Sequence, residues 1–108
     1  MEVRLTITFD SYITLRNILD DCRVLRITRH DYSRLMDITL ELERQATRRT
    51  RVADIVSLEL DALDYVCIRE CIFAVERFGC STRSSEEVRT LVTELDWSCE
   101  LADALIGD

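Results

Sequence analysis

The stretch that decides the fold is Val56–Phe78, VSLELDALDYVCIRECIFAVERF. Apolar and polar residues alternate over 56–62, which is the period of a half-buried strand. From Asp64 onward the apolar residues recur every three or four positions, which is the period of an amphipathic helix. These residues are Tyr65, Ile68, Cys71, Ile72, Val75 and Phe78. The stretch therefore predicts a strand that leads into a helix packing back on it, and the rest of the chain must cover this pair.

The N-terminal part of the chain has the same layout. Apolar and polar residues alternate over 3–9, VRLTITF, with Phe9 on the apolar side, so this segment predicts a strand with one buried face. A helix follows, with Asp10 or Ser11 as its N-cap. Its apolar stripe consists of Tyr12, Leu15, Ile18, Leu19 and Cys22.

A numbering shift of 53 aligns the two stretches without a gap. Residues 3–19 then share four identities with 56–72 over 17 positions, and the shift also places the apolar stripe of 35–42 on that of 88–95. The identities in the first stretch are Val3/Val56, Leu5/Leu58, Tyr12/Tyr65 and Arg16/Arg69. Our hypothesis is an internal duplication of a strand–helix–helix unit, with halves of about 1–50 and 54–108. The alternative is that any two amphipathic strand–helix pairs resemble each other.

The remaining segments complete the two halves. Residues 23–30 are a short strand or a connection, and residues 31–48 predict a helix, although the alternation over 38–43 also suits a strand. The basic segment 47–53 is the expected linker between the halves. Gly79 stands where a helix C′ glycine belongs, and Ser84 with Glu87 forms a capping box. The last helix is expected at about 85–105, with a core stripe of Val88, Leu91, Val92, Leu95, Cys99, Ala102 and Ile106.

Length and composition limit the fold class. A chain of 108 residues suffices for one domain with one core, and its lack of proline and its two glycines disfavour loop-rich and sandwich folds. We expect a single α+β domain over 1–108, in which a small two-stranded sheet is covered by about four helices. Such a sheet is marginal without helix packing, and its open edges would favour dimerisation through a strand or the last helix.

The charge balance limits the partners. The formal net charge is −7, and all 14 basic residues are arginine, so direct binding to a nucleic-acid backbone is disfavoured and a basic partner is favoured. No apolar run is long enough to cross a membrane, and the N-terminus does not have the pattern of a signal peptide. We therefore expect a cytoplasmic protein that binds no membrane, with its five cysteines reduced.

Motifs that would carry catalysis or bind a cofactor are not found in the sequence. It contains no glycine-rich phosphate loop, nucleophile elbow or H-E-x-x-H motif, so we expect neither an enzyme nor a cofactor. Cys67 and Cys71 lie four residues apart on one expected helix, but a thiolate metal site usually needs a second pair of ligands. His30 next to Asp31 is the remaining candidate for acid–base chemistry. Buried thiols that pack as small apolar groups are the simpler interpretation.

Trp97 is the outlier of the last helix. At 100° per residue it points about 180° from the core stripe, and Leu101 and Leu105 continue on its side. Three acidic residues flank this side, namely Asp96, Glu100 and Asp103. An exposed tryptophan with apolar neighbours and a polar rim is typical of the centre of an interface. Burial of Trp97 under another part of the chain is the alternative.

The sequence thus favours a non-catalytic acidic module that binds another protein or a second copy of itself. A small inhibitor that blocks a basic surface of its partner, of the type found in phages and mobile elements, fits this size and charge. The alternative is a small enzyme or a thiol or metal-binding protein that uses His30 or Cys67 and Cys71.

Overall fold

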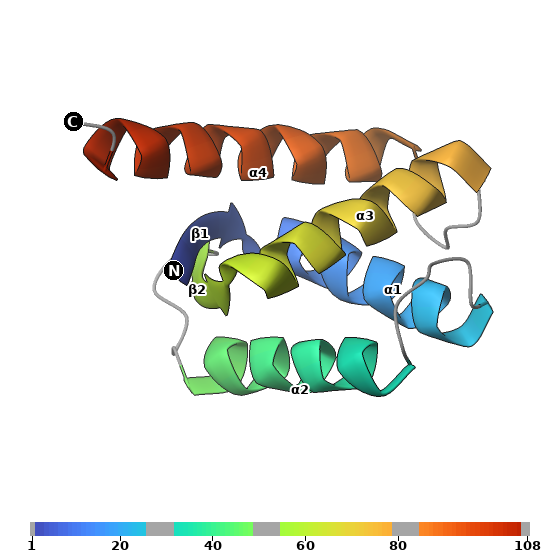
Figure 1. Ribbon diagram of the computed structural model, residues 1–108. Coiled ribbons are helices and arrows are strands. Elements are labelled where there is room, and N and C mark those ends of the chain that lie inside the picture. The colour runs from blue at the N-terminus through green and yellow to red at the C-terminus, as the bar shows by residue number, and fades with distance from the viewer. Residues whose placement is uncertain (1, 26–31, 49–54, 79–84, 107–108) are drawn as a thin grey trace.

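The computed structural model describes residues 2–25, 32–48, 55–78 and 85–106, and their side chains over 3–24, 33–46, 55–78 and 85–98. These described residues form two strands and four helices (Figure 1). In chain order these are β1 (Glu2–Thr8), α1 (Phe9–Leu25), α2 (Tyr32–Arg48), β2 (Ile55–Asp61), α3 (Ala62–Phe78) and α4 (Ser85–Ile106). The expected α+β class, with a two-stranded sheet and four helices, is confirmed.

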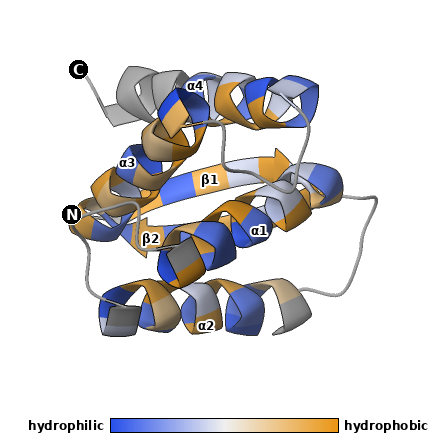
Figure 2. Cartoon of the chain, turned by 90° about the vertical axis from the view of Figure 1, so that its right-hand side faces the viewer, coloured by the Kyte–Doolittle hydropathy of each residue, from blue (hydrophilic) through white to orange (hydrophobic). Residues whose placement is uncertain are grey.

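The two strands pair antiparallel, with Leu5 opposite Leu58. Because side chains alternate along a strand, one face of the sheet carries the buried residues and the other carries exposed residues such as Arg4 and Thr6. The buried face consists of Leu5, Ile7, Val56, Leu58 and Leu60, with Val3 packed against them. Helices α1 and α3 contact this face. Figure 2 shows the two strands between α4 and α2, with β1 on the α4 side and β2 on the α2 side.

The outer edges of both strands are bonded to helices. The backbone N–H of Thr6 in β1 donates to Ser98 Oγ of α4 at 2.9 Å. On the other edge, Gln45 of α2 accepts from the N–H of Glu59 at 2.7 Å and donates to its carbonyl at 2.8 Å. The expectation that both strands would present open edges is therefore wrong at these positions, because side chains of the flanking helices satisfy the backbone.

The core joins the expected apolar stripes of all four helices to the sheet. It includes Leu15, Ile18, Leu19, Leu35, Ile38, Leu42, Ile68, Ile72, Leu91 and Leu95, each at most 3% exposed. Among the residues whose side chains are described, two that were expected in the core are exposed. Phe9 is 40% exposed and Phe78 is 59% exposed. Phe9 is exposed because β1 ends one residue earlier than the alternation suggests. Phe9 therefore begins α1 instead of ending the strand.

Thr8 determines where β1 ends and α1 begins. Its Oγ1 accepts a hydrogen bond from the backbone N–H of Ser11 at 3.2 Å, which is the bond that an N-cap residue makes to the third helical position. The N-cap is therefore Thr8, and the expected capping by Asp10 or Ser11 is wrong. A threonine that ends a strand can serve in both roles because an N-cap residue keeps extended backbone angles.

Two other boundaries differ from the expectation, since residues 23–25, expected in a short strand or a connection, are helical, and so are the first residues of the expected linker. Residues 38–43 are helical, as favoured, and 23–25 end α1. Residues 47 and 48 of the expected linker belong to α2. The rest of that linker, residues 26–31, Gly79 and Ser84 lie outside the described residues. Among the described helices, none is both long enough and apolar enough to cross a bilayer.

Candidate interaction surface on the last helix

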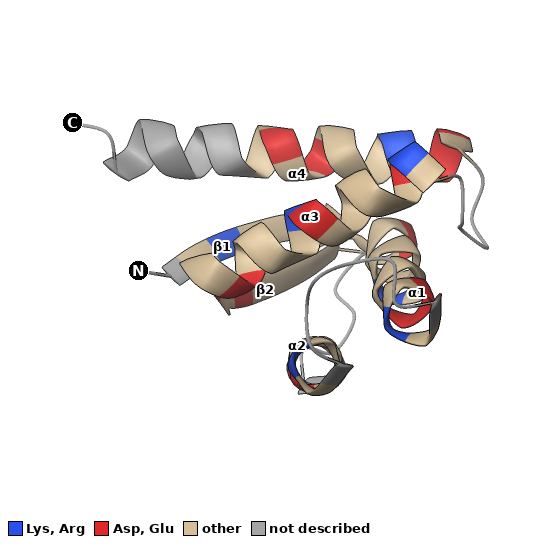
Figure 3. Ribbon diagram, turned by 45° about the vertical axis from the view of Figure 1, so that its right-hand side comes forward, with Lys and Arg blue, Asp and Glu red and all other residues tan. Residues whose placement is uncertain are grey.

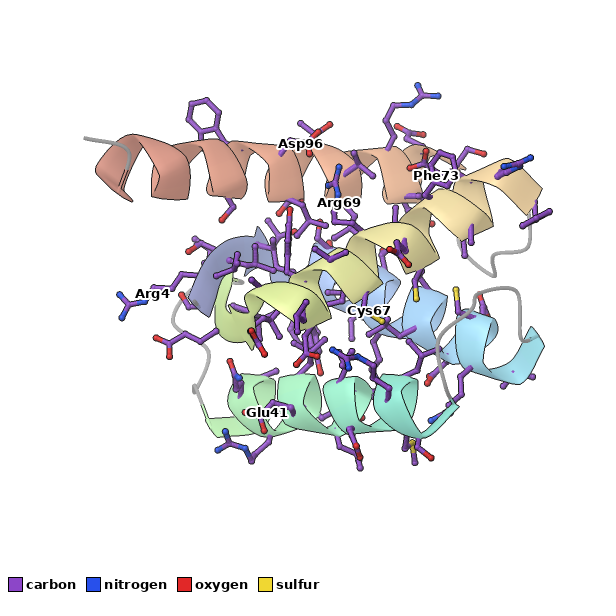
Figure 4. The ribbon with its side chains drawn as sticks, in the orientation of Figure 1. Arg4, Glu41, Cys67, Arg69, Phe73 and Asp96 are labelled. Carbon is purple, nitrogen blue, oxygen red and sulfur yellow. The ribbon has the colours of Figure 1, made fainter. Side chains whose placement is uncertain are left out.

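The inward side of α4 is fixed by apolar packing and by three polar contacts. Val88, Leu91 and Leu95 are buried in the core. Ser98 binds the edge of β1, as described above, and Asp96 pairs with Arg69 of α3 through Oδ1 and Nη1 at 3.0 Å. Figure 4 shows Arg69 directed from α3 toward Asp96 on α4. These contacts lie on different sides of the inward face, so they fix the rotation of α4 about its axis.

Glu94 provides the third polar contact, at the N-terminus of α1. Its carboxylate accepts hydrogen bonds from the backbone N–H of Thr8 at 2.7 Å and from the Thr8 hydroxyl at 3.2 Å. The hydroxyl of Ser11, which is 3% exposed, donates to the same carboxylate. A negative charge at this end of α1 also opposes the partial positive charge of the helix dipole. Glu94 therefore holds α4 on the first turn of α1.

Trp97 points away from these contacts. Its side chain is 65% exposed, which is the position that the helical wheel of α4 predicts for it. The alternative of burial under another part of the chain does not agree with this exposure. Because Glu94, Asp96 and Ser98 are all bonded to the body of the protein, α4 cannot turn Trp97 inward without breaking them.

The other residues of the predicted surface divide into two groups. Asp96 lies on the α3 side of α4 and keeps 55% of its side chain exposed while it pairs with Arg69. The backbone of α4 includes Glu100, Leu101, Asp103 and Leu105, but their side chains lie outside the described residues. The structure therefore places the tryptophan and the first acidic residue of the surface.

Helix α4 carries much of the acidity of the chain. Its sequence contains six carboxylate residues and one arginine, whereas α2 contains three of each charge. Figure 3 shows acidic residues in the first turn and in the middle of α4. Six carboxylates and one arginine give the sequence of α4 a formal charge of −5, so the helix has a negative field. This field favours the approach of positive charge.

A second group of residues that could carry chemistry, three cysteines, lies in the core. Cys22 of α1 and Cys67 and Cys71 of α3 are free thiols and are at most 1% exposed. The thiol of Cys22 also donates to the backbone carbonyl of Cys71 at 3.6 Å. Figure 4 shows Cys67 on the side of α3 that faces away from α4.

The environment of these thiols keeps two of them protonated. Burial raises the pKa of Cys67. A side-chain hydrogen bond between the Cys22 and Cys71 thiols, together with burial, raises the pKa of Cys71, and this bond between the thiols lowers the pKa of Cys22. Over the part of the chain that the structure describes, no three His, Cys, Asp or Glu side chains are placed to hold a metal ion. His30, Cys80 and Cys99 lie outside the residues whose side chains are described.

The sequence did not indicate the polar contacts that orient α4. Threonine is a preferred N-cap residue, and Thr8 stands at the end of the expected strand, so its capping role could have been predicted from the sequence. Glu94 and Ser98 gave no such signal, since their partners lie 86 and 92 residues away in sequence.

No protein-family model, curated protein or solved structure matches this chain. The surface therefore has to be judged by its own chemistry.

Proposed function

We propose that this chain is a non-catalytic interaction module that binds another protein through the outward face of α4. The observation that supports this most is Trp97, which is 65% exposed on a helix whose rotation is fixed. Tryptophan is among the residues that contribute most binding energy when a partner covers them. Exposing so large an apolar side chain gives the isolated protein nothing, whereas it would provide an anchor for a partner.

We further propose that the chain arose by internal duplication, with residue n of the first half equivalent to residue n + 53. The bounds of β1 and α1 become those of β2 and α3 under this shift. The sheet register has the same relation, since Leu5 pairs with its own equivalent, Leu58. Exchanging the two halves therefore leaves the strand pairing unchanged, as a pseudo-twofold axis requires.

Long-range hydrogen bonds support the same equivalence. The N–H of Thr6 donates to Ser98, and the N–H of Glu59 donates to Gln45. Under the shift Thr6 corresponds to Glu59 and Gln45 corresponds to Ser98, so one bond is the image of the other although all the residue types differ. In each half, a side chain of the second helix thus accepts a hydrogen bond from a backbone N–H on the strand of the other half.

An ion pair between the helices of each half is also repeated. Arg16 of α1 pairs with Glu43 of α2, and Arg69 of α3 pairs with Asp96 of α4. The shift converts the first pair into the second. Chance resemblance between two amphipathic units explains a shared period, but it does not explain matched partners between specific positions.

The equivalence gives Trp97 an internal control. The residue at its place in the first half is Arg44, which is exposed and pairs with Glu41. Because the fold accepts an arginine at this position, packing does not require a tryptophan at 97. The same comparison separates the acidic α4 from α2, whose charges balance. The differences between the halves therefore point to a role of α4 that α2 does not share.

The charge of α4 favours a partner with a basic surface. Complementary charge raises the rate of association and suppresses wrong partners, while a desolvated aromatic anchor supplies affinity. A small acidic module of this kind would act as an inhibitor if it covered a basic surface that its partner uses, as phage and mobile-element inhibitors would. Thiol or metal chemistry at Cys67 and Cys71 has weaker support, since both thiols are buried and their raised pKa values disfavour the reactive thiolate.

Affinity capture with matched variants tests this proposal. The wild-type chain, Trp97→Ala and the control Arg44→Ala would serve as baits in extract from cells that produce the protein. We expect a protein with a basic surface to be retained by the wild type and by Arg44→Ala and to be lost with Trp97→Ala. Rising salt should slow its association, because the steering is electrostatic. Equal retention by all three baits would contradict the proposal.

A further inference from the structure

Helix α3 also presents apolar side chains to solvent. Leu63, Val66 and Phe73 are 66%, 50% and 63% exposed. Together with Glu70 and Arg77 they are spaced at alternating intervals of three and four residues, so they form one seam along the outward face of the helix. The seam is clear of the inward side of α3, where Cys67, Ile68, Cys71 and Ile72 are buried.

The fold does not require an apolar seam at these positions. The residues of α1 that correspond to Leu63 and Phe73 under the shift of 53 are Asp10 and Asp20. This comparison uses only the matched bounds of α1 and α3, so it holds whether or not the halves share an origin. At two of the three apolar positions of the seam, the second half therefore has an exposed apolar residue where the first half has a carboxylate, while Val66 corresponds to the apolar Ile13.

The charges around Phe73 have mirror order along the chain. Arg69 and Glu70 precede it by four and three residues, and Glu76 and Arg77 follow it by three and four. When two copies of α3 cross antiparallel with Phe73 at the centre, Arg69 lies one helical rise, about 1.5 Å, from the level of Glu76 in the second copy. Glu70 has the same relation to Arg77 of the second copy. Arg69 and Glu76 share one flank of α3, and Glu70 and Arg77 share the other, so both pairings are sterically matched.

We propose that a second copy of this chain docks on the outward face of α3, antiparallel and with its twofold axis beside Phe73. Two Phe73 rings pack against each other at the centre, and four Arg–Glu pairs surround them. The arginines of this face meet the glutamates of an identical face, so a second copy has the complementary charges. An unrelated partner would need the same arrangement of charges around an apolar centre. Figure 4 shows Arg69 and Phe73 one turn apart on α3. Arg69 already pairs with Asp96 through the buried Nη1, so the donors on Nη2 and Nε are the ones that would contact Glu76 of the second copy.

The interface is small, because a single helix from each copy forms its centre. It falls at the low end of specific interfaces, where association is weak and depends on protein concentration. Trp97 belongs to α4 and is not one of the seam residues of α3. Self-association through Phe73 and the proposed function of Trp97 therefore rest on different side chains, and each can fail without the other.

Sedimentation equilibrium of the full chain over a series of concentrations tests the proposal. We expect a reversible monomer–dimer equilibrium, and Phe73→Asp should weaken it at least tenfold. Val24→Asp is the matched control, since Val24 is also an exposed apolar residue but lies on α1, and it should leave the equilibrium unchanged. Urea melts of both variants verify that they fold.

Charge exchange provides the sharper readout. Glu70→Arg and Arg77→Glu should each weaken the dimer, and the double variant should restore it, because the exchange re-forms the pairs with reversed sign. A chain that remains monomeric at all concentrations would overturn the proposal. So would a dimer that tolerates Phe73→Asp, or one that Trp97→Ala dissociates, which would place the contact between copies on α4 instead.

Discussion

Replacing Glu94 with glutamine should separate α4 from the first turn of α1. The glutamate accepts three hydrogen bonds, from the N–H and hydroxyl of Thr8 and from the hydroxyl of Ser11. Glutamine keeps one acceptor oxygen, but it presents an NH₂ group where the second oxygen stood and removes the charge at the helix N-terminus. The Ser11 hydroxyl could accept from this NH₂ group, but because it is buried its own proton would be left without an acceptor and without water.

The expected cost follows from these contacts. Hydrogen bonds to a charged group contribute about 1.5–3 kcal/mol, neutral ones about 0.5–1.5 kcal/mol, and the helix dipole adds roughly 0.3–1 kcal/mol. Glu94 is partly exposed, which reduces the electrostatic share. We therefore expect Glu94→Gln to lower the free energy of unfolding by about 1–2 kcal/mol.

Urea denaturation followed by circular dichroism measures this change, and Glu41→Gln is the control. Glu41 is the equivalent of Glu94 in the first half, but it binds Arg44 and Gln45 on its own helix. Pairs of this type contribute only about 0.2–0.5 kcal/mol. Equal losses in the two variants would refute the reasoning that Glu94 clamps α4 onto α1.

Two further predictions concern the core and the strand edges. Ser98→Ala and Gln45→Ala should each lower the free energy of unfolding by about 1 kcal/mol in urea melts, because each leaves an edge N–H of the sheet without its partner. A large loss for only one of them would contradict the equivalence of the two edges. Between pH 7 and pH 9.5 the wild type should lose more stability than Cys67→Ala. The folded pKa of Cys67 is raised above its unfolded value, so its contribution is full below the unfolded pKa and is lost as unfolded thiols ionise. Parallel stability curves for the two proteins would show that the Cys67 thiol does not stay protonated in the folded state.

Much of the fold follows from the periodicity of the sequence. Alternation over 3–9 and 56–62 predicted both strands, and the apolar stripes predicted four helices with nearly all of their buried residues. The misplaced residues lie at the ends of elements. The apolar character of Phe9 extended the alternation of β1, while Thr8 ended the strand by capping α1. Periodicity does not record which hydroxyl caps a helix, so such a boundary is uncertain by a residue.

The arrangement of the helices around the sheet was harder to foresee. Sequence indicated that α2 and α4 are amphipathic, but not that each lies along a strand edge of the other half. The contacts that establish this join residues far apart in the chain, such as Thr6 with Ser98. For the surface, the helical wheel placed Trp97 correctly, since its direction depends only on the core stripe of its own helix. The pairing of Asp96 with Arg69 depends on how α3 and α4 pack, which no local pattern contains.

The most direct test of the α4 surface is to measure two free energies for Trp97→Ala. The exposed ring predicts a loss of folding stability of about 1 kcal/mol or less, since surface substitutions cost little. Binding to the captured partner, measured by calorimetry, should weaken by roughly 2 kcal/mol or more, as truncation of an aromatic anchor does. Unchanged binding together with a folding loss of about 3–5 kcal/mol, the cost of deleting a buried tryptophan, would contradict the account and assign Trp97 to the core.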